Sequence, residues 1–208
     1  MKLRKITALV PMMLLLGACS EAPKPAEQAK PAAKSAEPVS ALSAVYKMFT
    51  QARSWAPDAK ILRVASISLK EVKSQAGKSG AWEATFVSEA GGRARRYTYS
   101  VVESAPSNLP EGVFGNSPES WTAGGQAKPF LIQALKSDST AAYEAAIKDK
   151  KGAEYLAKHP DMSILFLLEQ TSRFPDPAWR VVWGDSVSTS GFSVFTDAMT
   201  GDFLQTTK

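Results

Sequence analysis

An apolar run near the N-terminus ends at the only cysteine among the 208 residues of the chain. Three basic residues precede residues 6–16, and the small residues Gly17 and Ala18 separate this run from Cys19. A positively charged start, an apolar stretch and small residues at its end are the parts of a secretory signal peptide. The run is too short to span a bilayer, which takes about 20 apolar residues. We therefore predict that residues 1–18 are a signal peptide and that the chain folds only beyond Cys19.

The sequence Leu16-Gly17-Ala18-Cys19 resembles the lipobox of bacterial lipoproteins. The resemblance implies cleavage between Ala18 and Cys19, a diacylglycerol thioether on the cysteine sulfur, and an acyl chain such as palmitate on the new amino group. A thiolate is nucleophilic enough to take the lipid, and several acyl chains exceed what stable anchoring needs. Ser20 resembles the sorting pattern of outer-membrane lipoproteins, which implies the inner leaflet of the outer membrane, facing the periplasm. The alternative is a secreted chain in which Cys19 is incidental.

Residues 19–39 are rich in alanine, proline, lysine and glutamate and contain no aromatic residue. Such a sequence buries too little apolar surface to offset the entropy lost on ordering. Its prolines favour extended geometry, with an upper reach of about 60 Å at roughly 3.1 Å per residue. We predict a disordered, lipidated tether over residues 19–39.

Charge and cysteine content exclude several classes of function. The chain has 25 basic and 20 acidic residues, but three of the basic ones lie in residues 1–18, which leaves 22 against 20. This balance argues against a nucleic-acid partner, which selects a clustered basic face. No cysteine remains after Cys19, so disulfides and sulfur-ligated zinc are excluded beyond it. We predict no cofactor and no metal site.

Residues 40–104 have the pattern of one helix followed by a small sheet. Ser40 is a suitable N-cap for a helix that continues to about residue 54, with apolar residues at three- and four-residue spacing. Three strand candidates follow, at residues 61–72, 81–88 and 93–103. In the third, Tyr97 and Tyr99 alternate with polar residues, which predicts a strand with one solvated face.

The same order recurs in residues 129–208. We predict a short helix at residues 129–136, a longer one at 139–158 interrupted by Gly152, and strands at 162–170, 178–183, 191–197 and 203–205. Residues 105–128 are rich in proline, glycine and serine, and we predict a crossing loop docked by Phe114 and Trp121. The expected fold is α+β, with two helix-plus-antiparallel-sheet (αβββ) units at residues 40–104 and 129–208.

Four short segments of the second unit together resemble a PepSY-type unit. They are AEYL at residues 153–156, HPD at 159–161, AWRVVWG at 178–184 and FTDAMTGDFL at 195–204. The resemblance covers residues 139–208 and implies a helix on a small antiparallel sheet, a PepSY- or cystatin-like fold. It also implies a module that binds or restrains other envelope proteins, and it brings no catalytic residues.

The residues themselves agree with that architecture. Trp179, Val181 and Trp183 alternate onto one face, where a helix can cover them. Asp197 and Gly201 suit a turn that needs an acceptor side chain and a residue tolerant of positive φ.

Two sets of polar residues are candidates for catalysis. His159, the sole histidine, precedes Pro160, and we expect it to cap a helix end, because a triad or metal site needs partners that its spacing does not offer. Four acids could be paired for hydrolysis, although all lie in predicted turns, where aspartate bonds to nearby backbone amides: Asp176, Asp185, Asp197 and Asp202.

A partner surface is a further candidate. Arg93, Arg95 and Arg96 form the densest basic cluster, which could meet phosphate or an acidic lipid headgroup, or could simply be the solvated start of a strand. Trp121 lies in a glycine-bounded loop, and an exposed tryptophan there would mark a binding surface.

The function we expect is that of a non-enzymatic envelope lipoprotein that binds another envelope protein at the membrane surface. One alternative is a carrier that holds a small apolar or lipid ligand between helix and sheet, which a cavity of several hundred cubic ångströms would favour. The other alternative is a carboxylate-based hydrolase that uses Asp197 and Asp202.

Overall fold

The computed structural model describes residues 36–207. The predicted signal peptide, Cys19 and the tether up to residue 35 lie outside these residues. Val39, at the end of the predicted tether, belongs to strand β1 (Val39–Ser40). This strand pairs antiparallel with β3 (Lys78–Ser79) in a small two-stranded sheet.

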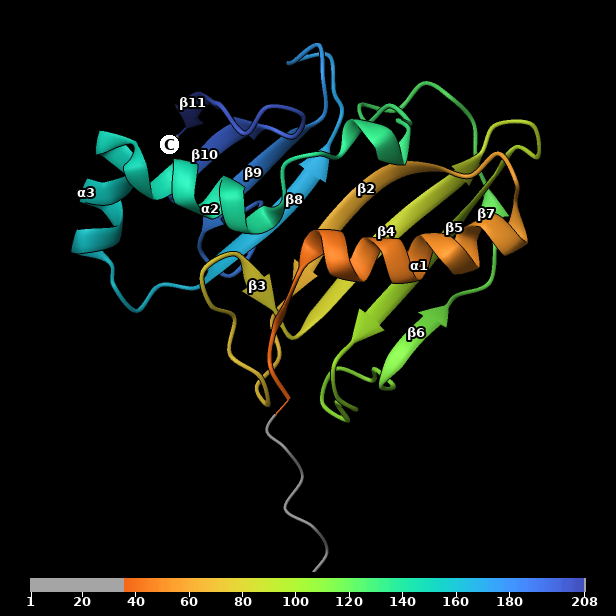
Figure 1. Ribbon diagram of the computed structural model, residues 1–208, viewed down its shortest axis with the longest axis horizontal. Helices are drawn as coiled ribbons and strands as arrows, with labels where there is room; N and C mark the ends of the chain where they lie inside the picture. Colours follow the sequence, from red (N-terminus) through yellow and green to blue (C-terminus); the bar gives the residue numbers. More distant parts are fainter. Residues whose placement is uncertain (1–35, 208) are drawn as a thin grey trace, which may run out of the picture. The chain divides into compact units, whose positions relative to one another are not determined.

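Nine strands form one antiparallel sheet in the order β11-β10-β9-β8-β2-β4-β5-β6, with β7 also paired to β5 (Figure 1). Their bounds are β2 (Lys60–Ile67), β4 (Ala81–Ser88), β5 (Arg93–Ser100), β6 (Gly112–Gly115), β7 (Glu119–Ser120), β8 (Ile164–Glu169), β9 (Ala178–Trp183), β10 (Phe192–Asp197) and β11 (Phe203–Thr207). Together with its helices, this sheet confirms the predicted α+β class.

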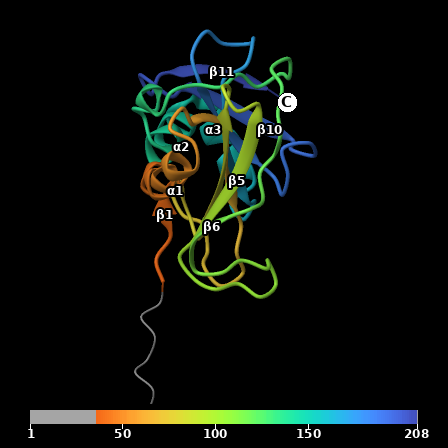
Figure 2. The ribbon, with the colours of Figure 1, turned by 90° about the vertical axis from the view of Figure 1, so that its right-hand side faces the viewer.

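The helices lie on one face of the sheet. They are α1 (Ala41–Trp55), α2 (Ser139–Lys148) and α3 (Lys150–Lys158), together with a 3₁₀ turn, η1 (Ile132–Ala134). Helix α1 packs on β4 and β5, and α2 packs on β9 and β10 (Figure 2). Val45 and Met48 of α1 and Ala142 of α2 are fully buried in the core that results. Trp179, Val181 and Trp183 face this core as predicted.

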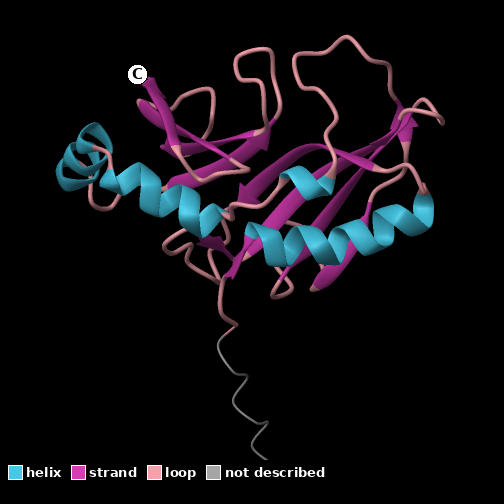
Figure 3. Cartoon of the chain, turned by 45° about the horizontal axis from the view of Figure 1, so that its top comes forward, coloured by secondary structure: helices cyan, strands magenta, loops and turns pink. Residues whose placement is uncertain are grey.

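Strand order is mirrored about the pairing of β2 with β8, which we call the seam. Outward from the seam the strands read β2-β4-β5 on one side and β8-β9-β10 on the other. Val64 lies opposite Leu168 in the seam, and the rings of Trp82 and Trp179 meet edge to face across it at 6.5 Å. Helices α1 and α2 begin close together near the seam and run apart (Figure 3).

The segment predicted as a crossing loop carries two strands. Strands β6 and β7 both pair with β5 and extend the sheet at that edge. Phe114, which we expected to anchor the loop, is 50% exposed. It lies opposite Thr98, and Thr98 and Ser100 are buried although we predicted a solvated face for them. Strand β6 thus lies beside these polar positions, which alternation alone assigns to solvent.

Two helix predictions also need correction. The helix expected at residues 129–136 is only the turn η1, because Phe130 exchanges backbone hydrogen bonds with Ile61 and so stays extended. The long helix breaks at Asp149 and not at Gly152. The Asp149 carboxylate accepts from the backbone amides of Lys151 and Gly152, both at 3.0 Å, and thereby caps α3.

Candidate functional site

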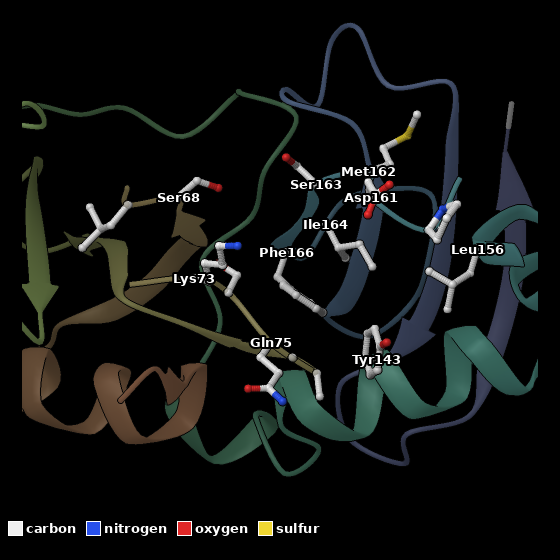
Figure 4. Close-up of a pocket in the computed structure, with 15 residues that line it drawn as sticks. Ser68, Lys73, Gln75, Tyr143, Leu156, Asp161, Met162, Ser163, Ile164 and Phe166 are labelled. Carbon is white, nitrogen blue, oxygen red and sulfur yellow. The ribbon is translucent and has the colours of Figure 1, made fainter. Parts of the chain in front are cut away.

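A cavity of about 540 Å³ opens where the two halves of the sheet meet (Figure 4). One wall is the connection from β2 to β3, and the other consists of α2, α3 and the start of β8. We call this cavity the seam groove. Its lining residues are Ser68, Leu69, Lys73, Ser74, Gln75, Ala76, Gly77, Tyr143, Leu156, Pro160, Asp161, Met162, Ser163, Ile164 and Phe166.

The seam groove has an apolar floor. Ile164 and Phe166 of β8 line it together with Tyr143 of α2 and Leu156 of α3 (Figure 4). Phe166 is only 3% exposed, and its ring packs 6.2 Å from that of Trp82 in the core. The floor is therefore an extension of the rigid core, which makes the groove preformed.

Charged side chains of opposite sign stand on the two walls. Lys73 extends into the groove from the β2–β3 connection, and Asp161 lies on the side of α3 and β8 (Figure 4). Both residues are exposed. An apolar floor between two charges can bind an amphipathic segment and set its orientation.

A strained turn forms part of the groove wall. Ala76 and Gly77 have φ of 45° and 82°, and the backbones of Gln75 and Lys78 bond to each other across them. Positive φ is unfavourable for alanine, so the turn stores strain of about 1 kcal/mol. Gly77 has no substitute, because a Cβ there would come within 2.5 Å of the Thr140 Cα. Strain of this kind occurs preferentially at functional sites.

The predicted partner residues lie away from this groove. Arg95 points to the helix side, where its Nε donates to the Asn116 carbonyl at 2.7 Å. Arg96 points to the opposite face and lies 3.7 Å from Glu83. Arg93 is exposed, with its guanidinium 6.0 Å from the Trp55 ring. Trp121 is partly buried and donates its backbone amide to Gly92. The structure thus divides the basic cluster between two faces.

Asp197 is engaged in a turn, as its sequence context predicted. Its carboxylate accepts from the amides of Met199 at 2.7 Å and Thr200 at 3.0 Å, and Gly201 has a φ of 83°.

His159 ends α3 as expected, with its ring 4.5 Å from that of Tyr155. Within residues 36–207, no group of three His, Cys, Asp or Glu side chains is arranged to hold a metal ion.

Sequence reasoning did not identify the seam groove. Lys73 and Asp161 are 88 positions apart in the chain, and long-range contacts, the β2–β8 pairing first among them, bring their segments together. The local sequence feature that belongs to the groove is the turn at Ala76-Gly77, and its sequence is that of an ordinary loop.

Comparisons with known proteins give one distant structural likeness. No protein-family model matches the sequence, and no curated protein sequence does. A crystal structure of a protein from Clostridium difficile 630, described there as a proposed lipoprotein, aligns with a TM-score of 0.46 at 9% identity, over 84% of this chain and 94% of that chain. This likeness is too low to carry an argument about function.

No helix within residues 36–207 has both the length and the apolar character needed to cross a bilayer.

Proposed function

We propose that this chain is a non-enzymatic, lipid-anchored protein of the bacterial envelope that binds a segment of another envelope protein in the seam groove. The observation that carries the proposal is the groove itself, a preformed apolar floor between Lys73 and Asp161. The anchor would hold the groove at the membrane surface, on the inner leaflet of the outer membrane facing the periplasm.

The anchor is supported by the lipobox-like residues at Leu16-Gly17-Ala18-Cys19. Mass spectrometry of the mature protein should find an N-terminal Cys19 carrying a diacylglycerol and an acyl chain. The Cys19→Ala variant should lose both lipids and stay unprocessed at Ala18. An unmodified thiol, or a different N-terminal residue, would contradict the anchor.

The mirrored strand order supports reading the fold as two PepSY- or cystatin-like αβββ units. Each half has helical structure followed in the chain by three strands that are neighbours in the main sheet, β2, β4 and β5 after α1, and β8, β9 and β10 after α2 and α3. For the second half, this interpretation also rests on the PepSY-like motifs at residues 153–204. Units of that kind bind or restrain other envelope proteins, which agrees with a protein partner for the groove.

Photo-cross-linking in bacterial cells tests the proposal directly. Benzoylphenylalanine at Leu156, on the α3 wall of the seam groove, should give a covalent adduct of protein mass. The matched control is the same probe at Tyr46, which is 50% exposed on α1 and lies outside the groove. Lys73→Glu, which gives both walls the same charge as Asp161, should reduce the Leu156 adduct. Equal adducts at Leu156 and Tyr46, or none at either, would overturn the proposal.

A carrier of a small apolar or lipid ligand is the second candidate. The groove volume of about 540 Å³ falls within the range of small-molecule sites, roughly 300–1,000 Å³. The same experiment separates the two candidates, because a carried lipid would add a few hundred daltons to the Leu156 variant and no protein band.

A further inference from the structure

A second cavity, of about 400 Å³, lies on the sheet face opposite the helices. Successive side chains of β8 point to opposite faces of the sheet, so that Phe166 lines the seam groove whereas Leu167 and Glu169 line this second cavity. Arg180 of β9, Phe195 of β10 and Arg173 of the β8–β9 loop complete its wall. We call it the arginine pocket.

Arg180 is held in a fixed orientation by two hydroxyls. Its Nε donates to the Ser193 Oγ at 3.0 Å, and its Nη2 donates to the Ser190 Oγ at 3.3 Å. Hydroxyls orient a guanidinium without neutralising it, and an arginine has five N–H donors in all. The remaining donors of Arg180 are therefore available to a ligand in the pocket.

Arg173 brings a second guanidinium to the same place, and the Gln205 side-chain amide oxygen accepts from its Nε and Nη2. Its Cζ lies 4.4 Å from the centre of the Phe195 ring, and the Cζ of Arg180 lies 5.6 Å from that centre. Phe174 packs on Phe195 at 5.4 Å and so holds the loop that carries Arg173 against the sheet. Two cations thus share one aromatic ring, which attracts each of them.

The charge of this pair is not balanced nearby. Among residues 36–207, no carboxylate oxygen lies within 4.0 Å of Arg173 or Arg180. Glu169 also lines the pocket, but it pairs with Arg63 at 3.6 Å. Burial and the proximity of Arg173 both lower the pKa of Arg180, while Glu169 acts in the opposite direction. The pocket therefore retains an excess of positive charge.

We propose that the arginine pocket binds a phosphate group, held between the guanidinium groups of Arg173 and Arg180. Arginine forks match the geometry of phosphate oxygens and form charge-assisted hydrogen bonds with them. The hydroxyl of Ser172, which also lines the pocket, can donate to a third oxygen. The phosphate would belong either to a soluble compound or to a lipid headgroup. This site is separate from the seam groove and stands whether or not the groove binds a protein.

The test follows the arginine side chains by NMR. Inorganic phosphate is titrated into the full-length protein in a non-ionic detergent, and the guanidinium N–H signals of Arg173 and Arg180 should shift and saturate. Arg173→Gln and Arg180→Gln should each weaken phosphate binding roughly tenfold or more, as expected for loss of a charge-assisted hydrogen bond. Arg96→Gln is the matched control, because Arg96 lies on the same face beside Glu83 and outside the pocket.

The control should change phosphate affinity less than about twofold, since an exposed paired arginine contributes little. No saturable shift in the native protein, or equal weakening by Arg96→Gln and Arg173→Gln, would overturn the proposal. Arg173 is exposed on a loop, so its variant decides the matter even if Arg180→Gln disturbs the sheet.

A second arm identifies the source of the phosphate. A chain that begins at Ser20, and so carries neither the apolar leader nor an acyl anchor, is mixed with nanodiscs of phosphatidylglycerol or of phosphatidylcholine. Preferential binding to phosphatidylglycerol that Arg173→Gln abolishes assigns a lipid headgroup. Saturation by inorganic phosphate with no such preference assigns a soluble phosphate compound.

Discussion

Close backbone packing gives single glycines in this chain very different importance. Gly152, in the first turn of α3, lies so near α2 that a Cβ there would come within 1.9 Å of the Ala146 carbonyl oxygen. Gly125 lies in a loop where a Cβ would meet nothing within 4 Å. Substitution of Gly152 therefore tests the close contact between α2 and α3, and substitution of Gly125 is its control.

We predict that Gly152→Ala destabilises the protein by about 1–3 kcal/mol, the usual cost of overpacking, although alanine favours a helix. Gly125→Ala should change the free energy of unfolding by less than about 0.5 kcal/mol. Urea denaturation measures both. Equal effects would show that α3 moves away from α2 without cost.

Asp58 makes the stability of the β4–β5 turn depend on pH. Its carboxylate accepts from the Ser88 hydroxyl at 2.8 Å and from the Ala90 amide at 3.1 Å. These hydrogen bonds, the Ser88 one foremost, lower the pKa of Asp58 below its ordinary value of 3.8. A depressed acid pKa contributes stability that is present above the unfolded-state pKa and is lost as pH falls through the folded-state pKa.

Asp58→Asn should therefore lower Tm at pH 6, and its effect should shrink as the pH falls through the lowered folded-state pKa of Asp58, where the native carboxyl becomes protonated as well. Thermal unfolding followed by circular dichroism across this range measures the difference. Ser88→Ala, which removes the first hydroxyl donor, should show the same pH trend. A Tm difference between native protein and Asp58→Asn that is constant with pH would contradict the assignment.

At the scale of elements, the start of α2 caps the start of α1. The amide of Ala41 donates to the Ser139 Oγ at 2.9 Å, and that of Leu42 donates to the Asp138 carboxylate at 2.9 Å. The Ser139 hydroxyl also donates to the Gly77 carbonyl at 2.6 Å. Two helix N-termini with like partial charges meet here, and the Asp138 carboxylate compensates both.

Ser40, the predicted N-cap of α1, makes no side-chain capping bond. We predict that Ser139→Ala costs about 1–3 kcal/mol, because it leaves a buried amide and a carbonyl without partners. Ser40→Ala should cost less than about 0.5 kcal/mol. Chemical denaturation of both variants tests this. A larger loss of unfolding free energy for Ser40→Ala than for Ser139→Ala would show that Ser40 caps α1.

For the whole molecule, the shared sheet and core predict that both halves unfold together. Leu168 is fully buried at the seam, opposite Val64. Leu168→Ala should lower the free energy of unfolding by about 2–5 kcal/mol and shift tryptophan fluorescence and far-UV circular dichroism transitions together. Leu131→Ala, at a site 57% exposed, is the control and should have little effect. Two separated transitions would show that the halves unfold independently.

Local patterns in the sequence were sufficient for much of the fold. The helix from residue 40, the core strands and the turn at Asp197 and Gly201 follow from period, turn chemistry and neighbours a few positions apart. Each of these features depends on interactions within about ten residues, which a single sequence records directly.

Long-range pairing determined the rest. The β2–β8 seam, the added strands β6 and β7, and the caps that Asp138 and Ser139 give to α1 all join segments far apart in the chain. Both candidate sites depend on such pairings, since Lys73 faces Asp161, and Arg173 reaches Phe195, only after the sheet forms. The sequence alone determined the α+β class, helix α1 and most strands of the main sheet, but not β6, β7 or the break at Asp149. Only the tertiary structure decided which side chains share a cavity. The spacing of apolar residues along a strand shows which face is buried, but it does not show which other strand lies beside it.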